Sequence, residues 1–385
     1  MQRMNKLKYY NIVDSYAVAE PGIRLQDLND ALLKEGYMFP VDPASVKSAT
    51  LGGAINSGAG GMRGAKYGTM REWIMQLEAV IPDEKGSVIR VGCKTTKCRQ
   101  GYDLVRLIVG SEGTLAIVTE AVVKITPIPD AVAIALGFFP SLKDLMTTVV
   151  EIKKKKYYPY IMEFLDEQTA KITVETMGGR VVGEGHMLLV GIDTAPEAVD
   201  RIASELGTIM RSNNARQVYT AKSLKEAEER GLFDLRRNYY PASIKIASST
   251  QKSPESRIFV FIEDIAVPPS KLVDAVIALR KLAEKYNMPL TLGGHVGDGN
   301  LHPISWFDLS DTEAREKAHK FYIDIMKLAI SMKGTMSCEH GIGTEKKEGL
   351  KIEFEALGST RPLDLMKEIK RIFDPKNILN PGKVV

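Results

Sequence analysis

The chain has few of the residues that staple, anchor or chelate. Its 385 residues include three cysteines, two tryptophans and five histidines, and no run of about 18 apolar residues. The lack of such a run excludes a membrane-spanning helix, and three cysteines cannot build a disulfide scaffold, so we expect a reducing compartment. Cys93 and Cys98 fit neither a CxxC redox pair nor a zinc ribbon, and we interpret them as ordinary thiols.

A strong charge of one sign is also missing. The chain carries 52 basic and 48 acidic residues, a net charge of +4, which predicts no nucleic-acid partner. The densest basic run, KKKK at 153–156, closes a predicted helix, and we interpret it as a solvated helix end. The N-terminus lacks the apolar core of a signal peptide. We therefore expect a cytoplasmic protein, with peripheral attachment to a membrane as the alternative.

The length predicts two domains, and two prolines, Pro127 and Pro129, indicate a boundary near residue 130. Beyond it, apolar runs alternate with helical periodicity. This alternation predicts an α+β layer, a sheet with helices on one face. The expected strands are 132–139, 160–165, 186–192, 257–267 and 289–295, and the expected helices are 141–156, 195–211, 270–287 and 312–332.

Glycines frame two of the five histidines in GGHVGDGNLH, residues 293–302. Glycines there permit positive φ and the close approach of a ligand or of another backbone. His295 and His302 could face one point, but two histidines need a further ligand to form a metal site. The glycine-flanked SCEHGIG, residues 337–343, offers Glu339 and His340. Two histidines and one glutamate would leave coordination positions open, as catalytic metals require. The alternative is that these are loop histidines in glycine-rich turns.

A second glycine-rich stretch spans residues 45–67 and includes Gly52, Gly53, Gly58, Gly60 and Gly61. Its backbone N–H groups could cradle a pyrophosphate. It has neither GxGxxG spacing after a strand nor a Walker lysine, so a flexible loop and a phosphate-binding loop are both consistent with its composition. The turn GSEGT at 110–114 could hold a cofactor in the same way.

Taken together, these stretches resemble the FAD-dependent oxidoreductases of the vanillyl-alcohol-oxidase type. The resemblance is to the branch that contains the glycolate oxidase flavoprotein GlcD, D-lactate dehydrogenase and D-2-hydroxyglutarate dehydrogenase. It rests on seven motifs in the family's order: EPGIRLQDLNDAL, DPASVKSATLGGAINSGAGGMRGAKYG, GYDLVRLIVGSEGTLAIVTEA, EDIAVPPSKL, GGHVGDGNLHP, SCEHGIGTEKKE and NILNPGKVV.

The resemblance implies a two-domain flavoprotein of α+β class. An FAD-binding domain would span residues 1–130, an α+β cap with an antiparallel sheet would span 131–344, and 345–385 would return to the FAD domain. No histidine precedes His186, so we expect the FAD to be bound non-covalently. The positions that match FAD contacts in the family are Thr50, Gly52, Gly53, Asn56, Ser57, Gly58, Glu112, Gly113, Ile117 and Asn380.

The resemblance also implies a reaction, the oxidation of a D-2-hydroxy acid (lactate, glycolate or 2-hydroxyglutarate class) with hydride transfer to FAD. His295, His302 and Glu339 match the ligands of a divalent metal (Zn, Mn or Fe) that would polarise the substrate hydroxyl. His340 matches the base that removes the hydroxyl proton. Asn300 and Arg236 match substrate-binding positions, with the Arg236 guanidinium suited to a carboxylate. In LFDLRR, Phe233 replaces the family's usual tryptophan, and the neighbouring Arg237 leaves the register open.

The chain departs from the family at its start, where MQRMNKL corresponds to the middle of the FAD domain. We expect a misplaced start or a truncated gene product. Two alternative functions therefore stay open: an alkyl-glycerone-phosphate-synthase-like flavin transferase, and a truncated, non-catalytic subunit that needs a partner to bind FAD. We expect an electron acceptor of unidentified type (quinone, ferredoxin, flavoprotein or iron–sulfur subunit). A dimer is one possible assembly.

Overall fold

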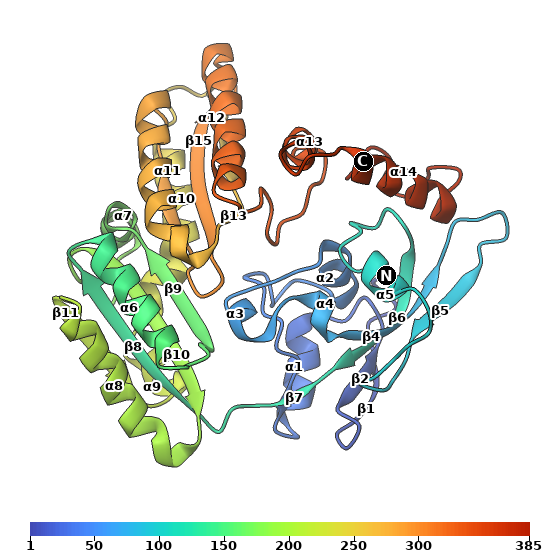
Figure 1. Ribbon diagram of the computed structural model, residues 1–385, viewed down its shortest axis with the longest axis horizontal. Coiled ribbons are helices and arrows are strands. Elements are labelled where there is room, and N and C mark those ends of the chain that lie inside the picture. The colour runs from blue at the N-terminus through green and yellow to red at the C-terminus, as the bar shows by residue number, and fades with distance from the viewer. The chain divides into compact units, whose positions relative to one another are not determined.

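The computed structural model describes residues 1–385, which divide into two compact units (Figure 1). Unit 1 comprises Met1–Ile128 and Glu339–Val385, and unit 2 comprises Pro129–Cys338. The second boundary falls before Glu339, whereas the sequence predicted it after residue 344. The physical reason is that the N–H groups of Ile342 and Gly343 donate to the carboxylate of Glu112, which lies in unit 1.

Unit 1 is built on a five-stranded antiparallel sheet in the order β1-β2-β6-β4-β5, with a separate β3-β7 pair. Its apolar core joins the sheet to α1 and α2, with Leu28, Ile55 and Leu77 fully buried. The elements are β1 (Leu7–Asn11), β2 (Tyr16–Ala19), α1 (Leu25–Leu33), β3 (Tyr37–Met38), α2 (Leu51–Ser57), α3 (Gly64–Tyr67), α4 (Met70–Trp73), β4 (Ile74–Val80), β5 (Val88–Gly92), α5 (Leu104–Ile108), β6 (Ile117–Lys124), β7 (Thr126–Pro127), α13 (Lys347–Ala356) and α14 (Arg361–Phe373).

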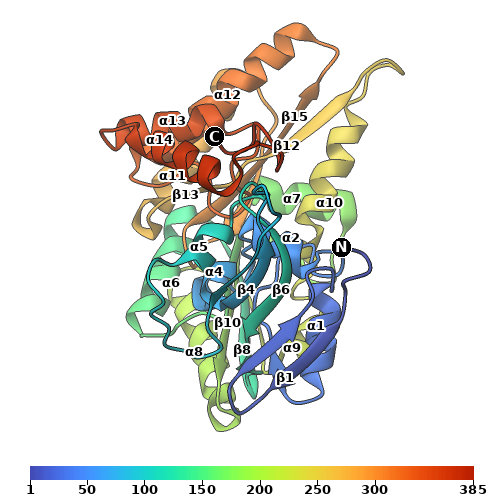
Figure 2. The same cartoon turned by 90° about the vertical axis from the view of Figure 1, so that its right-hand side faces the viewer.

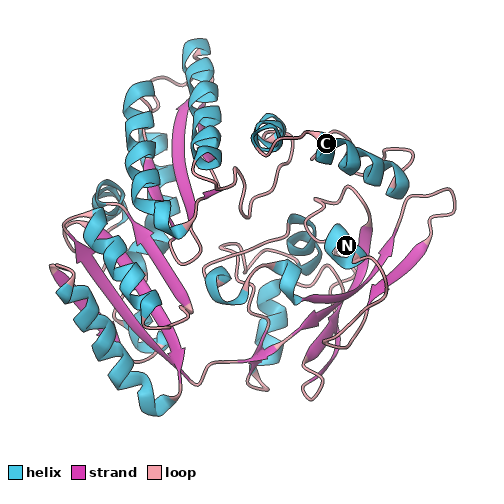
Figure 3. Ribbon diagram, viewed as in Figure 1, coloured by secondary structure: helices cyan, strands magenta, loops and turns pink.

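Unit 2 is built on an eight-stranded antiparallel sheet in the order β11-β8-β10-β9-β14-β15-β12, with β13 paired to β15 (Figure 3). Its elements are β8 (Ala131–Phe139), α6 (Leu142–Lys154), β9 (Ile161–Leu165), α7 (Glu167–Met177), β10 (His186–Thr194), η1 (Pro196–Ala198), α8 (Val199–Ser212), β11 (Gln217–Ala221), α9 (Leu224–Glu229), α10 (Asp234–Ser249), β12 (Ile258–Ile262), β13 (Ile265–Ala266), η2 (Pro269–Lys271), α11 (Leu272–Tyr286), β14 (Thr291–His295), β15 (Asn300–Asp308) and α12 (Thr312–Ser331).

Helices cover both faces of the unit 2 sheet, so the prediction of helices on one face was wrong. Helices α6, α8, α11 and α12 lie on one face and form the main core with alternate strand residues such as Met162, Phe164 and Leu292. Helices α7 and α10 pack together on the other face (Figure 2). The opposite alternate residues, which include Glu163 and His295, point to this second layer.

The two cysteines interpreted as thiols are joined. Cys93 and Cys98 form a disulfide across the loop after β5, and their Cα atoms lie 5.9 Å apart. This separation lies within the range that a disulfide can span, which a five-residue spacing in sequence does not reveal. Cys338 is the free cysteine. None of the helices has both the length and the apolar character needed to cross a membrane.

Candidate functional site

A pocket of about 370 Å³ in unit 1 lies beside the start of α2, the residues leading into β6 and the C-terminal loop. This volume is within the usual range for cofactor sites. Seven of the ten residues expected to contact FAD line it: Thr50, Gly52, Gly53, Asn56, Gly113, Ile117 and Asn380. They come from three segments far apart in sequence, which the fold of unit 1 brings together.

The other three expected FAD residues have structural contacts elsewhere. The Ser57 hydroxyl donates to the carbonyl of Ala54. Gly58 adopts φ +67° at the end of α2, and a Cβ there would lie 3.2 Å from the Cα of Gly110. The Glu112 carboxylate accepts N–H groups from the returning C-terminal segment, as described above. These three residues therefore hold the wall of the pocket in place.

The glycine N–H groups at the start of α2 are already used. The Gly52 N–H donates to the carbonyl of Pro21 at 2.7 Å, and the Gly53 N–H donates to Oγ1 of Thr50, the N-cap of α2, at 3.2 Å. A Cβ on Gly52 would lie 2.6 Å from Cβ of Pro21. These glycines therefore serve close packing of the pocket wall, and neither donates a free N–H to a phosphate.

Two features of the pocket fit a polar cofactor. Oδ1 of Asn56 is buried and accepts no hydrogen bond, and a buried acceptor without a donor is costly unless a ligand supplies one. Gly113 has φ +67°, and a Cβ there would lie 2.9 Å from Nδ2 of Asn380, which donates to the carbonyl of Glu112. Gly113 thus leaves room where any side chain would crowd the lining.

In unit 2, the two histidines of the glycine-rich turn lie close together. His295 ends β14, His302 lies near the start of β15, and their ring centroids are 5.1 Å apart. Both side chains are buried. At Gly299, φ is +95° and a Cβ would lie 2.0 Å from the carbonyl oxygen of Val267. Of the two uses expected for these glycines, close approach to another backbone is the one that the fold shows.

Glu163, which the sequence analysis did not identify, lies at the centre of this cluster. It faces His295 directly across the β9–β14 pair and is fully buried. Its carboxylate is 2.7 Å from Nδ1 of His295 and accepts a hydrogen bond of 2.6 Å from Nε of Arg236. Burial alone would raise the pKa of Glu163, but attraction to His295 and Arg236 and hydrogen bonds from both outweigh it, so the pKa lies below its usual range.

The structure separates the two neighbouring arginines in the first turn of α10. Arg236 points to Glu163, and its side chain is 15% exposed. Its Nη1 and Nη2 make no hydrogen bond within the chain, so the outer edge of the fork is open. Arg237 is exposed, pairs with Glu228 and lies over the ring of Phe233. Arg236 therefore occupies the position expected of a carboxylate-binding residue.

Asn300 is held by Asp264, a second residue that the sequence analysis missed. Nδ2 of Asn300 donates to Oδ1 of Asp264 at 2.9 Å and to the carbonyl of Ile265 at 3.0 Å. These two bonds fix the orientation of the amide. Its Oδ1 is buried and accepts no hydrogen bond, which leaves an acceptor for a ligand.

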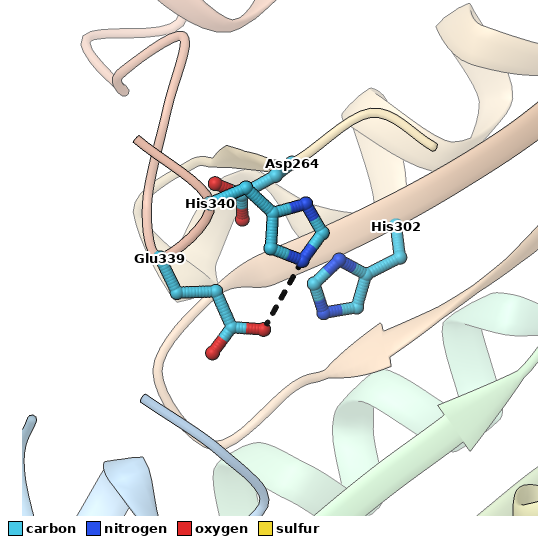
Figure 4. A group of neighbouring side chains, drawn as sticks. All are labelled: Asp264, His302, Glu339 and His340. Atoms are coloured by element: carbon cyan, nitrogen blue, oxygen red, sulfur yellow. Dashed lines mark ion pairs between the residues drawn. The ribbon is translucent and has the colours of Figure 1, made fainter. Parts of the chain in front are cut away.

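Asp264 also holds the chain where it leaves unit 2. Its Oδ2 accepts the Cys338 N–H at 2.7 Å and the Ser337 hydroxyl at 3.2 Å. Glu339 and His340 are the next two residues, so chain connectivity alone keeps them near Asp264. Figure 4 draws Asp264, His302, Glu339 and His340, a group whose side chains could hold a metal ion, with the Glu339–His340 ion pair dashed. The Glu339 carboxylate and Nε2 of His340 are 3.8 Å apart.

Two further residues support this site from outside. Lys153, from the basic run expected to be solvated, is partly buried and donates from Nζ to the carbonyl of Gly297 at 2.6 Å. Burial lowers the pKa of Lys153, and Asp298 partly opposes this. The buried hydroxyl of Tyr239 on α10 donates to the carbonyl of His302, and burial raises its pKa, so it remains a donor. Both contacts hold the turn between the histidines.

Comparison with known proteins identifies the family. Residues 128–384 match the C-terminal domain of FAD-linked oxidases, and residues 1–92 match an FAD-binding domain. The chain belongs to the FAD-linked oxidases. This FAD-linked oxidase is therefore an FAD-dependent oxidoreductase, as the resemblance implied.

Several characterised relatives share its sequence along almost the whole chain. Glycolate oxidase subunit GlcD of Bacillus subtilis is 35% identical over 390 residues, covering 100% of this chain and 78% of that protein. D-lactate dehydrogenase of Archaeoglobus fulgidus is 38% identical over 378 residues, covering 96% of this chain and 77% of that protein.

Solved structures show the same fold at low identity. The 4-ethylphenol oxidase of Gulosibacter chungangensis matches with a TM-score of 0.71 at 14% identity, covering 99% of this chain and 78% of that one. An alkyldihydroxyacetonephosphate synthase matches with a TM-score of 0.70 at 19% identity, covering 99% of this chain and 66% of that one. The predicted two-domain α+β fold of the vanillyl-alcohol-oxidase type is confirmed.

Proposed function

We propose that this FAD-linked oxidase converts a D-2-hydroxy acid of the lactate, glycolate or 2-hydroxyglutarate class into the 2-oxo acid. Relatives named as a glycolate oxidase component and as D-lactate dehydrogenase support the substrate class. The observation that carries the proposal is the open guanidinium edge of Arg236 beside the buried pair His295 and His302. A guanidinium suits a carboxylate, and imidazoles suit a metal that binds a hydroxyl.

Arg236 binds the substrate carboxylate through Nη1 and Nη2, while its Nε stays on Glu163. This bidentate contact fixes the carboxylate, and with it the position of C2. Asn300 presents its unused Oδ1 as an acceptor for a substrate hydroxyl or a bound water. The two residues orient a small hydroxy acid without any residue that selects the length of its side chain.

The residues present fit a divalent metal (Zn, Mn or Fe), with His295, His302 and Glu339 as ligands. The fit is chemical: two imidazoles and a carboxylate form a set that leaves open positions. His295 has the carboxylate partner on its other nitrogen that metal-binding histidines typically have. Such an ion supplies Lewis-acid polarisation of the substrate hydroxyl. Asp264 is an additional candidate ligand, although both its oxygens already accept hydrogen bonds.

His340 accepts the proton of the substrate hydroxyl. It is partly exposed, with 40% of its side chain accessible, so it can pass this proton to solvent. A histidine near neutral pH is well matched to this role. FAD, when bound non-covalently in unit 1, supplies the acceptor for the hydride from C2. Electrons then pass to a separate acceptor, for which quinone, ferredoxin, a flavoprotein and an iron–sulfur subunit are the candidates.

An absorbance spectrum of the FAD-loaded protein tests the proposal. We expect D-lactate, glycolate or D-2-hydroxyglutarate to bleach the flavin band in the absence of an acceptor, with L-lactate as the matched control. The 2-oxo acid, added in place of the hydroxy acid, should cause no bleaching. A spectrum unchanged by all D-2-hydroxy acids, with FAD bound, would contradict the proposed function.

The assignment of His340 as the base is tested by His340→Ala. We expect turnover to fall by about 10²–10⁴-fold, the usual contribution of a general base, with FAD still bound. His319→Ala, at an exposed histidine on α12, is the control and should retain full turnover. Full activity of His340→Ala would remove the assigned base.

Chelation tests the metal. We expect dialysis against a chelator to abolish flavin reduction by D-lactate, and added Zn²⁺ or Mn²⁺ to restore it. Elemental analysis before and after dialysis should show loss of about one divalent ion per chain. Indifference to the chelator together with no bound metal would refute the ligand assignment.

A transferase of the alkyl-glycerone-phosphate-synthase type gains no support from the structural likeness, because at 19% identity that likeness shows the fold alone. The non-catalytic alternative is decided by the same spectrum. A purified chain that stays colourless after FAD is added would favour a chain that needs a partner.

A further inference from the structure

Glu163 is the one fully buried carboxylate that contacts both a proposed metal ligand and the proposed substrate-binding arginine. Its partners are 132 and 73 residues away in sequence, on β14 and α10. A buried carboxylate is costly unless it is fully paired, and this one accepts from two donors. An apolar residue would pack equally well at this strand position, so the carboxylate needs a reason beyond stability.

The contact with His295 selects the form of its imidazole. Both carboxylate oxygens lie within hydrogen-bonding distance of Nδ1, at 2.7 and 2.9 Å. An ionised carboxylate is an acceptor only, so Nδ1 must carry the proton. Nε2 is then the nitrogen with a lone pair, which is the form that coordinates a metal. The direct cross-strand register of Glu163 and His295 fixes this pair by backbone pairing.

The contact with Arg236 selects which edge of the guanidinium is presented. Oε2 of Glu163 accepts from Nε at 2.6 Å, and the ring of Tyr239 lies 5.9 Å from the guanidinium carbon. These two neighbours hold the guanidinium plane, leaving Nη1 and Nη2 for a ligand. One carboxylate therefore orients both groups.

We propose that Glu163 is a positioning residue that couples the two halves of the substrate site, orienting His295 for a metal and Arg236 for the substrate carboxylate. This inference rests on the proposed function for its substrate half only. Because one carboxylate serves both donors, its removal should weaken metal binding and substrate binding together. Substitution of a residue that serves a single binding partner would affect one and spare the other.

The primary test is E163Q, which preserves size but replaces one acceptor oxygen with a donor. We expect the dissociation constant for Zn²⁺, measured by calorimetric titration of the metal-free FAD-loaded protein, to rise by about 10–100-fold, the usual effect of losing a partner of a metal-binding histidine. We also expect ¹⁵N-histidine spectra of the metal-free protein to show His295 changing from the Nδ1–H tautomer to a mixture. Neither measurement requires catalytic turnover.

The matched control is D166N. It breaks another buried arginine–carboxylate pair of unit 2, between Arg280 and Asp166, without touching His295 or Arg236. We expect D166N to keep the wild-type Zn²⁺ affinity and His295 tautomer. Equal losses in D166N and E163Q would overturn the proposal, because they would show a general effect of loosening the unit. A wild-type tautomer and Zn²⁺ affinity in E163Q would overturn it as well.

If E163Q does not fold, E163D decides the question. Its carboxylate is withdrawn by about one carbon–carbon bond, ~1.5 Å, and cannot reach both donors at once. We expect weaker Zn²⁺ binding and a higher KM for D-lactate, and an unchanged Zn²⁺ dissociation constant would overturn the proposal. If wild-type protein bound Zn²⁺ but oxidised no hydroxy acid, the proposed function would fail while the tautomer and Zn²⁺ measurements still decided the role of Glu163.

Discussion

At the scale of single residues, the site depends on the fork of Arg236. Arg236→Lys keeps the positive charge beside Glu163 but loses the planar pair of terminal amines. We expect KM for D-lactate to rise by about 10–100-fold, the value of a charge-assisted hydrogen bond of about 1.5–3 kcal/mol, with little loss of stability. Arg237→Lys, on the exposed neighbour, should leave KM unchanged. Steady-state kinetics decide between them, and equal effects would place the wrong arginine in the site.

Gly113 provides a second residue-scale test, of the FAD pocket. Gly113→Ala adds a Cβ 2.9 Å from Nδ2 of Asn380 in addition to the strain of a positive φ. Gly86 has nearly the same φ, +63°, but open space around it. Both Ala variants should lose about 1–2 kcal/mol of stability to backbone strain, while only Gly113→Ala should bind FAD more weakly in a fluorescence titration. Unaltered FAD affinity in Gly113→Ala would exclude this glycine from the site.

At the scale of elements, the end of α14 holds the C-terminal loop against the FAD pocket. The buried Asp374 accepts the N–H groups of Ile378 and Leu379 at 3.0 and 2.8 Å and pairs with Lys370. Lys370 also donates to the carbonyl of Thr114, at the other side of the pocket. Burial raises the pKa of Asp374, but these hydrogen bonds outweigh burial and leave the pKa below its usual value.

This shift has a definite sign for stability. Because the pKa of Asp374 is depressed in the folded state, its contribution is fully present above the unfolded-state pKa of about 3.9 and is lost as pH falls through the folded-state pKa. We expect Asp374→Asn to lose about 1–3 kcal/mol at pH 7 and to show a weaker decline below pH 4. Urea unfolding at pH 7, 4 and 3 measures this, with the exposed Asp364→Asn as the control. Parallel pH profiles for wild type and Asp374→Asn would contradict it.

At the scale of the whole molecule, the two tryptophans report on different units. Trp73 lies in unit 1 and Trp306 in unit 2, and each unit has its own apolar core. FAD bound in unit 1 should stabilise that unit by about 2.7 kcal/mol at 100 times its dissociation constant. In Trp306→Phe, where Trp73 remains, FAD should raise the melting temperature seen by tryptophan fluorescence. In Trp73→Phe the shift should be smaller, and equal shifts would show that the units unfold as one.

Periodicity and motif spacing predicted much of this molecule from sequence. The helix at 312–332 and the strand at 186–192 follow from local patterns and appear as α12 and β10. The second helix layer was missed because α7 and α10 have mixed, weakly amphipathic sequences. Glu163 and Asp264 were missed because their partners are far away in the chain. A signal existed: each is a carboxylate inside an apolar strand run, YIMEFL and FIEDIAV, where an unpaired charge would be too costly.

The return of the C-terminal segment has a consequence for how the chain is made. Unit 1 lacks its last wall until Asn380 donates to the carbonyl of Glu112 across 268 positions of sequence. A ribosome adding about 5–20 residues per second needs roughly 10–40 s to synthesise the intervening Pro129–Cys338. Unit 2 emerges whole in that interval, while the first 128 residues wait with part of their core exposed. Nascent unit 1 is thus the stage of biosynthesis at which chaperones have most to protect, and flavin can be captured fully only after the last codons are read.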